Sequence, residues 1–425
     1  MKICGMMSGV RVGVLATAWV RLFLSGAAAY DIEQIYTIPL DTYSYTHSGT
    51  TPSTYYKYGI HVGIGGGSSR VFEFDTGGEG FYAAYSEGAP WWGGNVTVST
   101  DPFTKQFGSN ITYTGNVTEA GLSFFKRDGT TLVLSTGTTE FKLGQATGIT
   151  QNGATLWPDG GGSAPVQQHF YGDFGLTLKK GDHGIENVFA QLTYGGGITA
   201  GYIVSLGPYG STGGASVQVG LRAEDLANPE TLWFTMQGQD TIKVFTGSGL
   251  PTYSAEILAA DMTLTLGSET HTFTDLGINL DTGNPTPGID YNGLDAATLE
   301  KFSVVDDHVP VSLSEETHLE LVSDPSGGGA PVSVFSLFAG AAYGEDFVYE
   351  KLRHGGETYL NIGALLFQQY NVTFNIADGL VGLTPIPEPG TAALFLLGAA
   401  GLLIAGARRR RRAGGAPPGR KPPPG

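Results

Sequence analysis

The chain has 425 residues, of which 41% are apolar, so it is long enough to bury one large core or two smaller ones. It has 23 basic and 39 acidic residues, but ten of the basic ones lie in the terminal segments 1–29 and 408–421. The body between them therefore carries 13 basic against 39 acidic residues, an excess that repels nucleic acid, and we expect no nucleic-acid partner.

Cysteine and histidine give no sign of a metal centre. Cys4 is the single cysteine, and it lies near the N-terminus, so the body of the chain has no disulfide and no thiolate ligand. The eight histidines show no spacing typical of metal ligands. We predict neither a metal nor another cofactor.

The first 29 residues fit a secretory leader. Lys2 and Arg11 precede an apolar stretch over 12–24, which Arg21 interrupts, and Ala27-Ala28-Ala29 form a small-residue cleavage site. We expect the protein to be exported across the inner membrane.

The body has the composition of a β protein. Gly occurs 66 times, and Thr, Val, Tyr and Phe are plentiful. Apolar and polar residues alternate clearly over 96–100 and 262–266, whereas helical patterns are confined to the short segments 221–228 and 296–301. The sequence predicts an all-β fold of many short strands.

One tripeptide occurs twice, as Asp75-Thr76-Gly77 and as Asp281-Thr282-Gly283, 206 residues apart and each after a strand-like run. One copy alone is most often a solvated turn. Two carboxyls that face each other cannot both ionise and so share a proton. Such a pair can deprotonate a water and protonate a peptide carbonyl, and the glycine allows a tight turn and close approach of a substrate backbone.

The C-terminal run 361–386 is the most specific segment. It contains Ile362-Gly363, then Gln369-Tyr370, then Val372-Thr373-Phe374-Asn375, then Val381-Gly382-Leu383-Thr384-Pro385. Without a gap it resembles the end of pepsin-like aspartic proteases, in which an apolar-Gly pair precedes a strand ending in Gln-Tyr and two further strands.

Other segments follow the order of the same family. The run 58–65 resembles the strand pair before the first catalytic Asp, and 111–115 is similar to the tip of the flap, whose Tyr closes over the substrate. The run 172–176 resembles the loop that supports the first motif, and 200–219 the crossover between the lobes.

The resemblance implies a bilobal fold with a central cleft, with an N-terminal lobe over 30–206 and a C-terminal lobe over 207–386. It implies an aspartic-type endopeptidase, a monomer, that hydrolyses a polypeptide substrate. The implied residues are catalytic Asp75 and Asp281, substrate-binding Gly77, Tyr113, Thr114, Gly283 and Asn284, and supporting Thr76, Thr282 and Tyr82.

The chain departs from the family around both motifs. Gly78 and Asn284 stand where a Ser or Thr hydroxyl usually donates to the outer oxygen of each Asp; the Asn284 amide can still donate, whereas Gly78 cannot. Asn279 replaces an apolar residue, and Tyr82 replaces the Trp to which the flap Tyr bonds. A catalytically weak or inactive binding or matrix protein on the same fold is therefore the alternative, and a structural β-rich surface protein unrelated to proteases is a third.

The C-terminus resembles the three-part PEP-CTERM sorting signal. Pro387-Glu388-Pro389 is followed by an apolar run over 391–407 and by arginines at 408–412. The run predicts a transmembrane helix in the inner membrane, with the arginines on the cytoplasmic side. The resemblance implies cleavage by an exosortase-type enzyme and a final location at the cell surface or outside the cell. We expect residues 413–425, rich in Pro and Gly, to be disordered.

Overall fold

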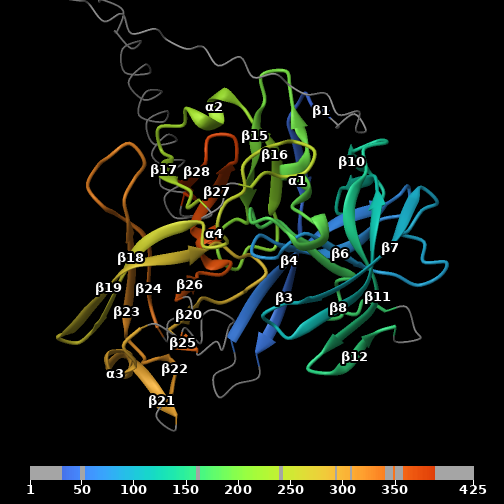
Figure 1. The fold of residues 1–425 in the computed structure, drawn as a ribbon. Helices are drawn as coiled ribbons and strands as arrows, with labels where there is room; N and C mark the ends of the chain where they lie inside the picture. Colours follow the sequence, from blue (N-terminus) through green and yellow to red (C-terminus); the bar gives the residue numbers. More distant parts are fainter. Residues whose placement is uncertain are drawn as a thin grey trace, which may run out of the picture.

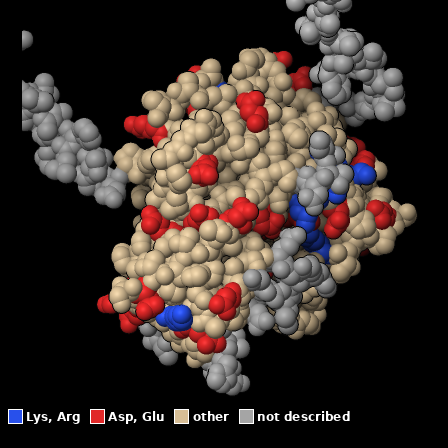
Figure 2. Space-filling view, turned by 60° about the vertical axis from the view of Figure 1, so that its left-hand side comes forward, with Lys and Arg blue, Asp and Glu red and all other residues tan. Residues whose placement is uncertain are grey.

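The computed structural model describes residues 31–47, 53–158, 163–238, 243–291, 294–306, 309–339, 348–349 and 358–387 (Figure 1). Most of these residues lie in strands, which confirms the predicted all-β class. Two lobes and a sheet between them are visible in Figure 1, with the early strands on the right and the late strands on the left. On the face drawn in Figure 2, acidic side chains outnumber basic ones, in agreement with the composition.

The first lobe is built on an eleven-stranded sheet. Its main order is β10-β9-β4-β5-β13-β6-β11-β8-β7, while β3 pairs with β4 and β12 with β11. The strands are β3 (Asp41–His47), β4 (Ser53–Ile64), β5 (Arg70–Asp75), β6 (Phe81–Ala84), β7 (Val96–Gln106), β8 (Ile111–Ala120), β9 (Leu122–Phe125), β10 (Leu132–Ser135), β11 (Phe141–Gln151), β12 (Ala154–Trp157) and β13 (Gly172–Gly175).

The second lobe is built on a seven-stranded sheet in the order β24-β23-β18-β19-β26-β20-β25. A separate two-stranded sheet pairs β21 with β22. The strands are β18 (Leu258–Leu266), β19 (Glu269–Asn279), β20 (Gly288–Asp290), β21 (Ser303–Asp306), β22 (Val309–Leu313), β23 (His318–Ser323), β24 (Val332–Phe338), β25 (Val348–Tyr349) and β26 (Tyr359–Asn361).

The two lobes repeat one topology. The order β10-β9-β4-β5-β13-β6-β11 in the first corresponds to β24-β23-β18-β19-β26-β20-β25 in the second. The orientations also agree: β5 is parallel to β13 as β19 is to β26, and β6 is antiparallel to β13 as β20 is to β26. The hairpin β7–β8 follows β6 and pairs with β11, and the hairpin β21–β22 follows β20 at the corresponding place in the second lobe. This internal repeat places the ends of β5 and β19 at equivalent positions.

A six-stranded sheet in the order β17-β28-β27-β15-β16-β2 joins the lobes. The predicted lobe boundary between residues 206 and 207 falls between β15 and β16, which are neighbours in this sheet. The strands are β2 (Tyr36–Pro39), β15 (Thr199–Ser205), β16 (Ser216–Leu221), β17 (Leu232–Thr235), β27 (Tyr370–Asn375) and β28 (Leu380–Pro385), and a further short sheet pairs β1 (Asp31–Ile32) with β14 (Thr193–Tyr194).

The helices of the described residues are short. Two lie inside the segments predicted as helical, α2 (Ala223–Leu226) and α3 (Ala296–Leu299). The others are α1 (Val188–Gln191), α4 (Leu365–Gln369) and the 3₁₀ turns η1 (Asp182–Gly184) and η2 (Glu300–Phe302). The prediction of a strand ending at Gln369-Tyr370 was wrong, since 365–369 form α4. Four of its five residues are buried, and a short apolar run such as 362–367 does not distinguish a strand from a helix.

The strand that carries the first motif is covered on both faces. Phe72 and Phe74 of β5 are fully buried, and Glu73 between them is only 7% exposed. Phe72 packs edge-to-face on Phe81, and Phe74 lies in register with Phe174 of β13. Aromatic packing on the face of Phe72 and Phe74, and burial of Glu73 on the other face, fix the end of β5 and therefore the position of Asp75.

Candidate active site

The two motif aspartates occupy equivalent places in the repeat. Asp75 is the last residue of β5, and Asp281 lies two residues after β19. Oδ1 of Asp75 accepts the backbone N–H groups of Gly77 and Gly78, both at 2.8 Å. Oδ1 of Asp281 accepts the backbone N–H of Asn284 at 2.9 Å. Each carboxyl is therefore oriented by its own turn, with its second oxygen, Oδ2, left for other partners.

The motif threonines tie the two loops together. The backbone N–H of Thr76 donates to Oγ1 of Thr282, and that of Thr282 donates to Oγ1 of Thr76, both at 3.0 Å. Each hydroxyl donates in turn to a carbonyl of the opposite strand end, Thr76 to Leu280 at 2.7 Å and Thr282 to Phe74 at 2.8 Å. Both threonines are buried, so these four bonds hold the loops in one relative position.

The motif glycines bring the carboxyls together across the loops. A Cβ at Gly77 would lie 2.4 Å from Cγ of Asp281, and a Cβ at Gly283 would lie 2.3 Å from Cγ of Asp75. Only glycine leaves room for this approach. Burial, the neighbouring Asp281 charge and a hydrogen bond with Asp281 raise the pKa of Asp75 well above its usual range. The aspartates and the motif glycines are half-buried, so the pair remains open to solvent on one side.

Asn361 is a site residue that the sequence did not reveal. It is the last residue of β26, it is 4% exposed, and its side-chain amide donates to Oδ2 of Asp281 at 2.6 Å. Its Oδ1 accepts the backbone N–H of Gly363 at 3.0 Å, which fixes the orientation of the amide. Asn284, whose side-chain amide was the predicted donor, instead donates its backbone N–H to Asp281. The position of Asn361 at the start of the run resembling the protease C-terminus was the available signal.

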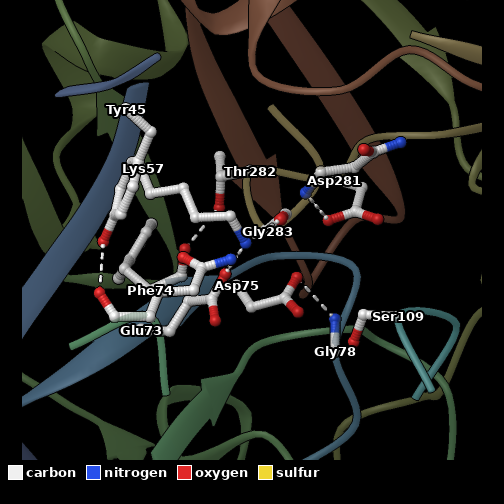
Figure 3. Close-up of polar contacts among 12 residues, drawn as sticks. Tyr45, Lys57, Glu73, Phe74, Asp75, Gly78, Ser109, Asp281, Thr282 and Gly283 are labelled. Carbon is white, nitrogen blue, oxygen red and sulfur yellow. Dashed lines mark hydrogen bonds and ion pairs between the residues drawn. The ribbon is translucent and has the colours of Figure 1, made fainter. Parts of the chain in front are cut away.

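A buried ion pair lies behind the motifs. Lys57 of β4 pairs with Glu73 of β5, and its Nζ also donates to the carbonyl of Gly283 at 2.8 Å (Figure 3). Burial alone lowers the pKa of Lys57, but Glu73, Asp75 and Asp281 outweigh it and the pKa is raised. Lys57 therefore places a positive charge beside the two aspartates. An acidic residue inside the apolar run 71–74 was the sequence signal for a buried partner.

The hairpin β7–β8 differs from the prediction. Its turn spans 107–110, because Gln106 pairs with Thr112 and the N–H of Phe107 donates to the carbonyl of Ile111 at 2.9 Å. The prediction that 111–115 forms the tip was wrong: these residues lie in β8, which pairs with β11 as well as β7. Residues 111–115 are held as a strand because β8 forms backbone hydrogen bonds with a neighbour on each side, β7 and β11.

The tyrosines assigned to substrate binding and support lie in contact. Tyr113 is 1% exposed, and its ring lies 6.0 Å from that of Tyr82 and 5.5 Å from that of Phe107. Burial raises the pKa of Tyr113, and so do the nearby carboxyls, Asp75 among them. Thr114, the next residue, is exposed. Tyr113 is thus a buried residue of the hairpin itself, close enough to the acidic site to be affected by its charges.

One ion pair connects the hairpin to the residue that follows the first motif loop. Glu79 follows the motif loop, and its carboxylate pairs with Lys105 of β7 and with Lys179. Burial on its own raises the pKa of Glu79, but Lys105 and Lys179 outweigh it and lower the pKa. Because Glu79 and Lys105 are largely buried, this pairing is screened less than one on the open surface.

Several predictions fall outside the part of the chain that the structure describes. Glu388, Pro389 and the apolar run 391–407 lie beyond its last residue, Pro387, which is exposed. No helix within the described ranges is long and apolar enough to span a membrane. Within the same ranges, no group of three or more His, Cys, Asp or Glu side chains is arranged to hold a metal ion.

Comparison with known proteins gives structural likeness alone. No protein-family model matches the chain, and no curated protein matches it. Among solved structures it is similar to the aspartic proteinase from Irpex lacteus, with a TM-score of 0.49 and 14% identity over 83% of this chain and 97% of that one. It is also similar to edgp, with a TM-score of 0.48 and 13% identity over 85% and 96% of the two chains. For basic 7S globulin from soybean the TM-score is 0.47, with 12% identity over 82% and 96%. Likeness at this level carries no conclusion about activity, which depends on the geometry of the site.

Proposed function

We propose that this protein is an aspartic-type endopeptidase of the bilobal pepsin-like class. The observation that carries the proposal is the reciprocal placement of the motifs, in which each motif glycine lies against the carboxyl of the other motif. Four buried threonine bonds fix that arrangement. Two aspartates held face to face at the ends of equivalent strands are what water activation by a shared-proton pair requires.

The chemistry follows from the protonation of the pair. With one carboxyl ionised and one protonated, the ionised group accepts a proton from a water while that water attacks the peptide carbonyl. The protonated group donates its proton to the carbonyl oxygen, and both groups exchange roles when the intermediate collapses. The raised pKa of Asp75 keeps one proton on the pair at higher pH than an ordinary Asp would. Activity should fall at low pH, where both carboxyls are protonated, and at high pH, where both are ionised.

The expected specificity is cleavage of extended polypeptide between bulky apolar residues. The half-buried Gly77 and Gly283 can offer backbone groups to a peptide, whereas Tyr113 and Tyr82 are each 1% exposed and pack against each other. The test is digestion of an unfolded protein by the purified chain from pH 2 to 7, with and without a pepstatin-type inhibitor. Asp75→Asn and Asp281→Asn are the matched controls, because each keeps the shape and removes a carboxyl. Equal turnover by the parent and both variants would end the proposal.

A binding or matrix protein on the same fold is the second candidate. It is favoured by Gly78, which supplies no side-chain donor to Asp75, and by the burial of Tyr113 within strand β8 of the hairpin. A folded parent that cleaves no unfolded protein at any pH, yet binds peptide equally well after Asp75→Asn, would support it.

Export is part of the proposal and depends on the two termini. We infer that residues 1–29 direct secretion and that 387–412 act as an exosortase-processed sorting signal, so that the lobes act at the cell surface or outside the cell. Without residues 387–425 the protein should be exported and not retained at the inner membrane. Cell fractionation would show it in the soluble exported fraction and not in the membrane fraction.

A further inference from the structure

Asp173 of β13 is a buried carboxyl for which the two-aspartate mechanism has no use. It is 4% exposed, and neither of its carboxyl oxygens has a hydrogen-bond partner among the described residues. A buried polar group without a partner is costly, and a buried charge without one costs more. An Asp in this state therefore requires a specific reason.

The internal repeat relates Asp173 to Asn361. β13 pairs with β5 so that Asp173 lies opposite the residue two before Asp75. β26 pairs with β19 so that Asn361 lies opposite the residue two before Asp281. The two side chains thus occupy the same place in the two lobes. Asn361 uses this place to donate to Oδ2 of Asp281 at 2.6 Å.

Gly78 makes the corresponding approach possible in the first lobe. A Cβ at this position would lie 2.7 Å from Oδ2 of Asp75 and 2.8 Å from Oδ2 of Asp173. Both oxygens therefore border the small volume that a side chain at position 78 would fill. Oδ1 of Asp75 already accepts two backbone N–H groups, and Oδ2 is the atom without a backbone donor.

We propose that Asp173 is a third carboxyl of the active site, held protonated, whose hydroxyl donates to Oδ2 of Asp75 as the Asn361 amide donates to Asp281. In this role it is a positioning residue, because it would act on the substrate only through Asp75. The inference rests on the proposed peptidase function for its catalytic consequence, but the hydrogen bond itself does not require catalysis.

The charges around Asp173 favour the protonated state. Burial and the nearby Glu73 raise its pKa well above the usual range, and Lys57 and Lys105 only partly oppose them. The titratable groups that face it from β4, β5, β6, β7, β8 and the second motif are Lys57, Glu73, Asp75, Tyr82, Lys105, Tyr113 and Asp281. Lys57 already pairs with Glu73, so a further negative charge at Asp173 would have no buried cation of its own. Asp173 stays neutral through the acid range and loses its proton, and so its donor, as the pH rises.

The test compares two replacements at one position. Asp173→Leu keeps the volume and removes the donor, and we expect kcat for peptide hydrolysis to fall about 10- to 100-fold with KM little changed, the range for a hydrogen bond to a charged group. Asp173→Asn supplies an amide donor at every pH. It should recover most of the kcat that the leucine variant loses, and its activity should persist to higher pH than that of the parent.

An infrared measurement tests the proton without catalysis. In the difference spectrum between the parent and Asp173→Asn, with aspartate labelled by ¹³C, the parent should show one additional protonated-carboxyl C=O band near pH 6. That band should move in Asp75→Asn, because a neutral acceptor replaces a carboxylate.

The outcomes separate the two proposals. A parent that hydrolyses nothing, with the extra band present and sensitive to Asp75→Asn, would end the peptidase proposal and support the hydrogen bond. Absence of the band, a band unchanged by Asp75→Asn, or equal losses of kcat in the leucine and asparagine variants would overturn the role of Asp173.

Discussion

Replacement of Lys57 by methionine tests the electrostatics behind the motifs most directly. Lys57 and Glu73 are each 7% exposed and form an ion pair, and Lys57 also donates to the carbonyl of Gly283 at 2.8 Å. Methionine retains the length and apolar contacts of the lysine stem. The variant leaves the Glu73 carboxylate buried without its cation, and removal of one partner of such a pair costs about 3–5 kcal/mol.

The loss should depend on pH in a definite direction. The pKa of Lys57 is raised above its ordinary value of 10.5, so its contribution to stability is complete below that value and disappears only as the pH rises through the higher, folded-state pKa. The parent therefore retains it throughout the acid and neutral range. In the variant, protonation of the isolated Glu73 carboxyl at acid pH removes the uncompensated charge. The penalty should be full at pH 7, shrink as the pH falls toward the ordinary range of a Glu carboxyl at about pH 4, and be absent below it.

The assay is urea unfolding followed by circular dichroism at pH 7 and at pH 4, with the double variant Lys57→Met/Glu73→Leu as control. Replacement of a whole buried pair by apolar residues is often neutral or stabilising, so the double variant should recover most of the loss. A single variant within about 1 kcal/mol of the parent at pH 7, or a penalty equal at both pH values, would refute the reasoning.

Three further predictions concern the other supports of the site. Asn361→Leu removes the donor to the Asp281 carboxyl and, if the proposed peptidase function holds, should lower kcat about 10- to 100-fold with KM nearly unchanged in steady-state peptide hydrolysis. An unchanged kcat in an active enzyme would contradict a role for this hydrogen bond. Glu79→Gln weakens the ion pair with Lys105, so backbone amide exchange in the β7–β8 hairpin should become faster and KM should rise. Identical exchange rates in the parent and the variant would show that the Glu79–Lys105 pair does not hold the hairpin. Thr282→Val removes a buried hydroxyl that both accepts and donates a hydrogen bond, so the free energy of unfolding should fall by about 1–3 kcal/mol. Thr282→Ser keeps the hydroxyl and should stay close to the parent. Equal losses of stability in both variants would indicate that packing, and not hydrogen bonding, is responsible.

The sequence determined the class of fold and indicated the two motif aspartates, because both depend on local patterns. Alternation over 96–100 and 262–266 predicted strands, and these segments lie in β7 and β18. The repeated tripeptide predicted that Asp75 and Asp281 act as a pair, and the structure brings the two motifs into contact. A turn that follows a strand is encoded by neighbouring residues, so it can be recognised without tertiary contacts.

The tertiary structure decided the residues that surround the pair. Lys57, Asp173 and Asn361 reach the motifs from β4, β13 and β26, and β13 and β26 each follow the strand of their motif by about eighty or more residues. No local sequence pattern marks Asp173. Only its register opposite β5 shows that it is the counterpart of Asn361. Side-chain function of this kind depends on which strands become neighbours in a sheet. That pairing is non-local, and a single sequence does not record it.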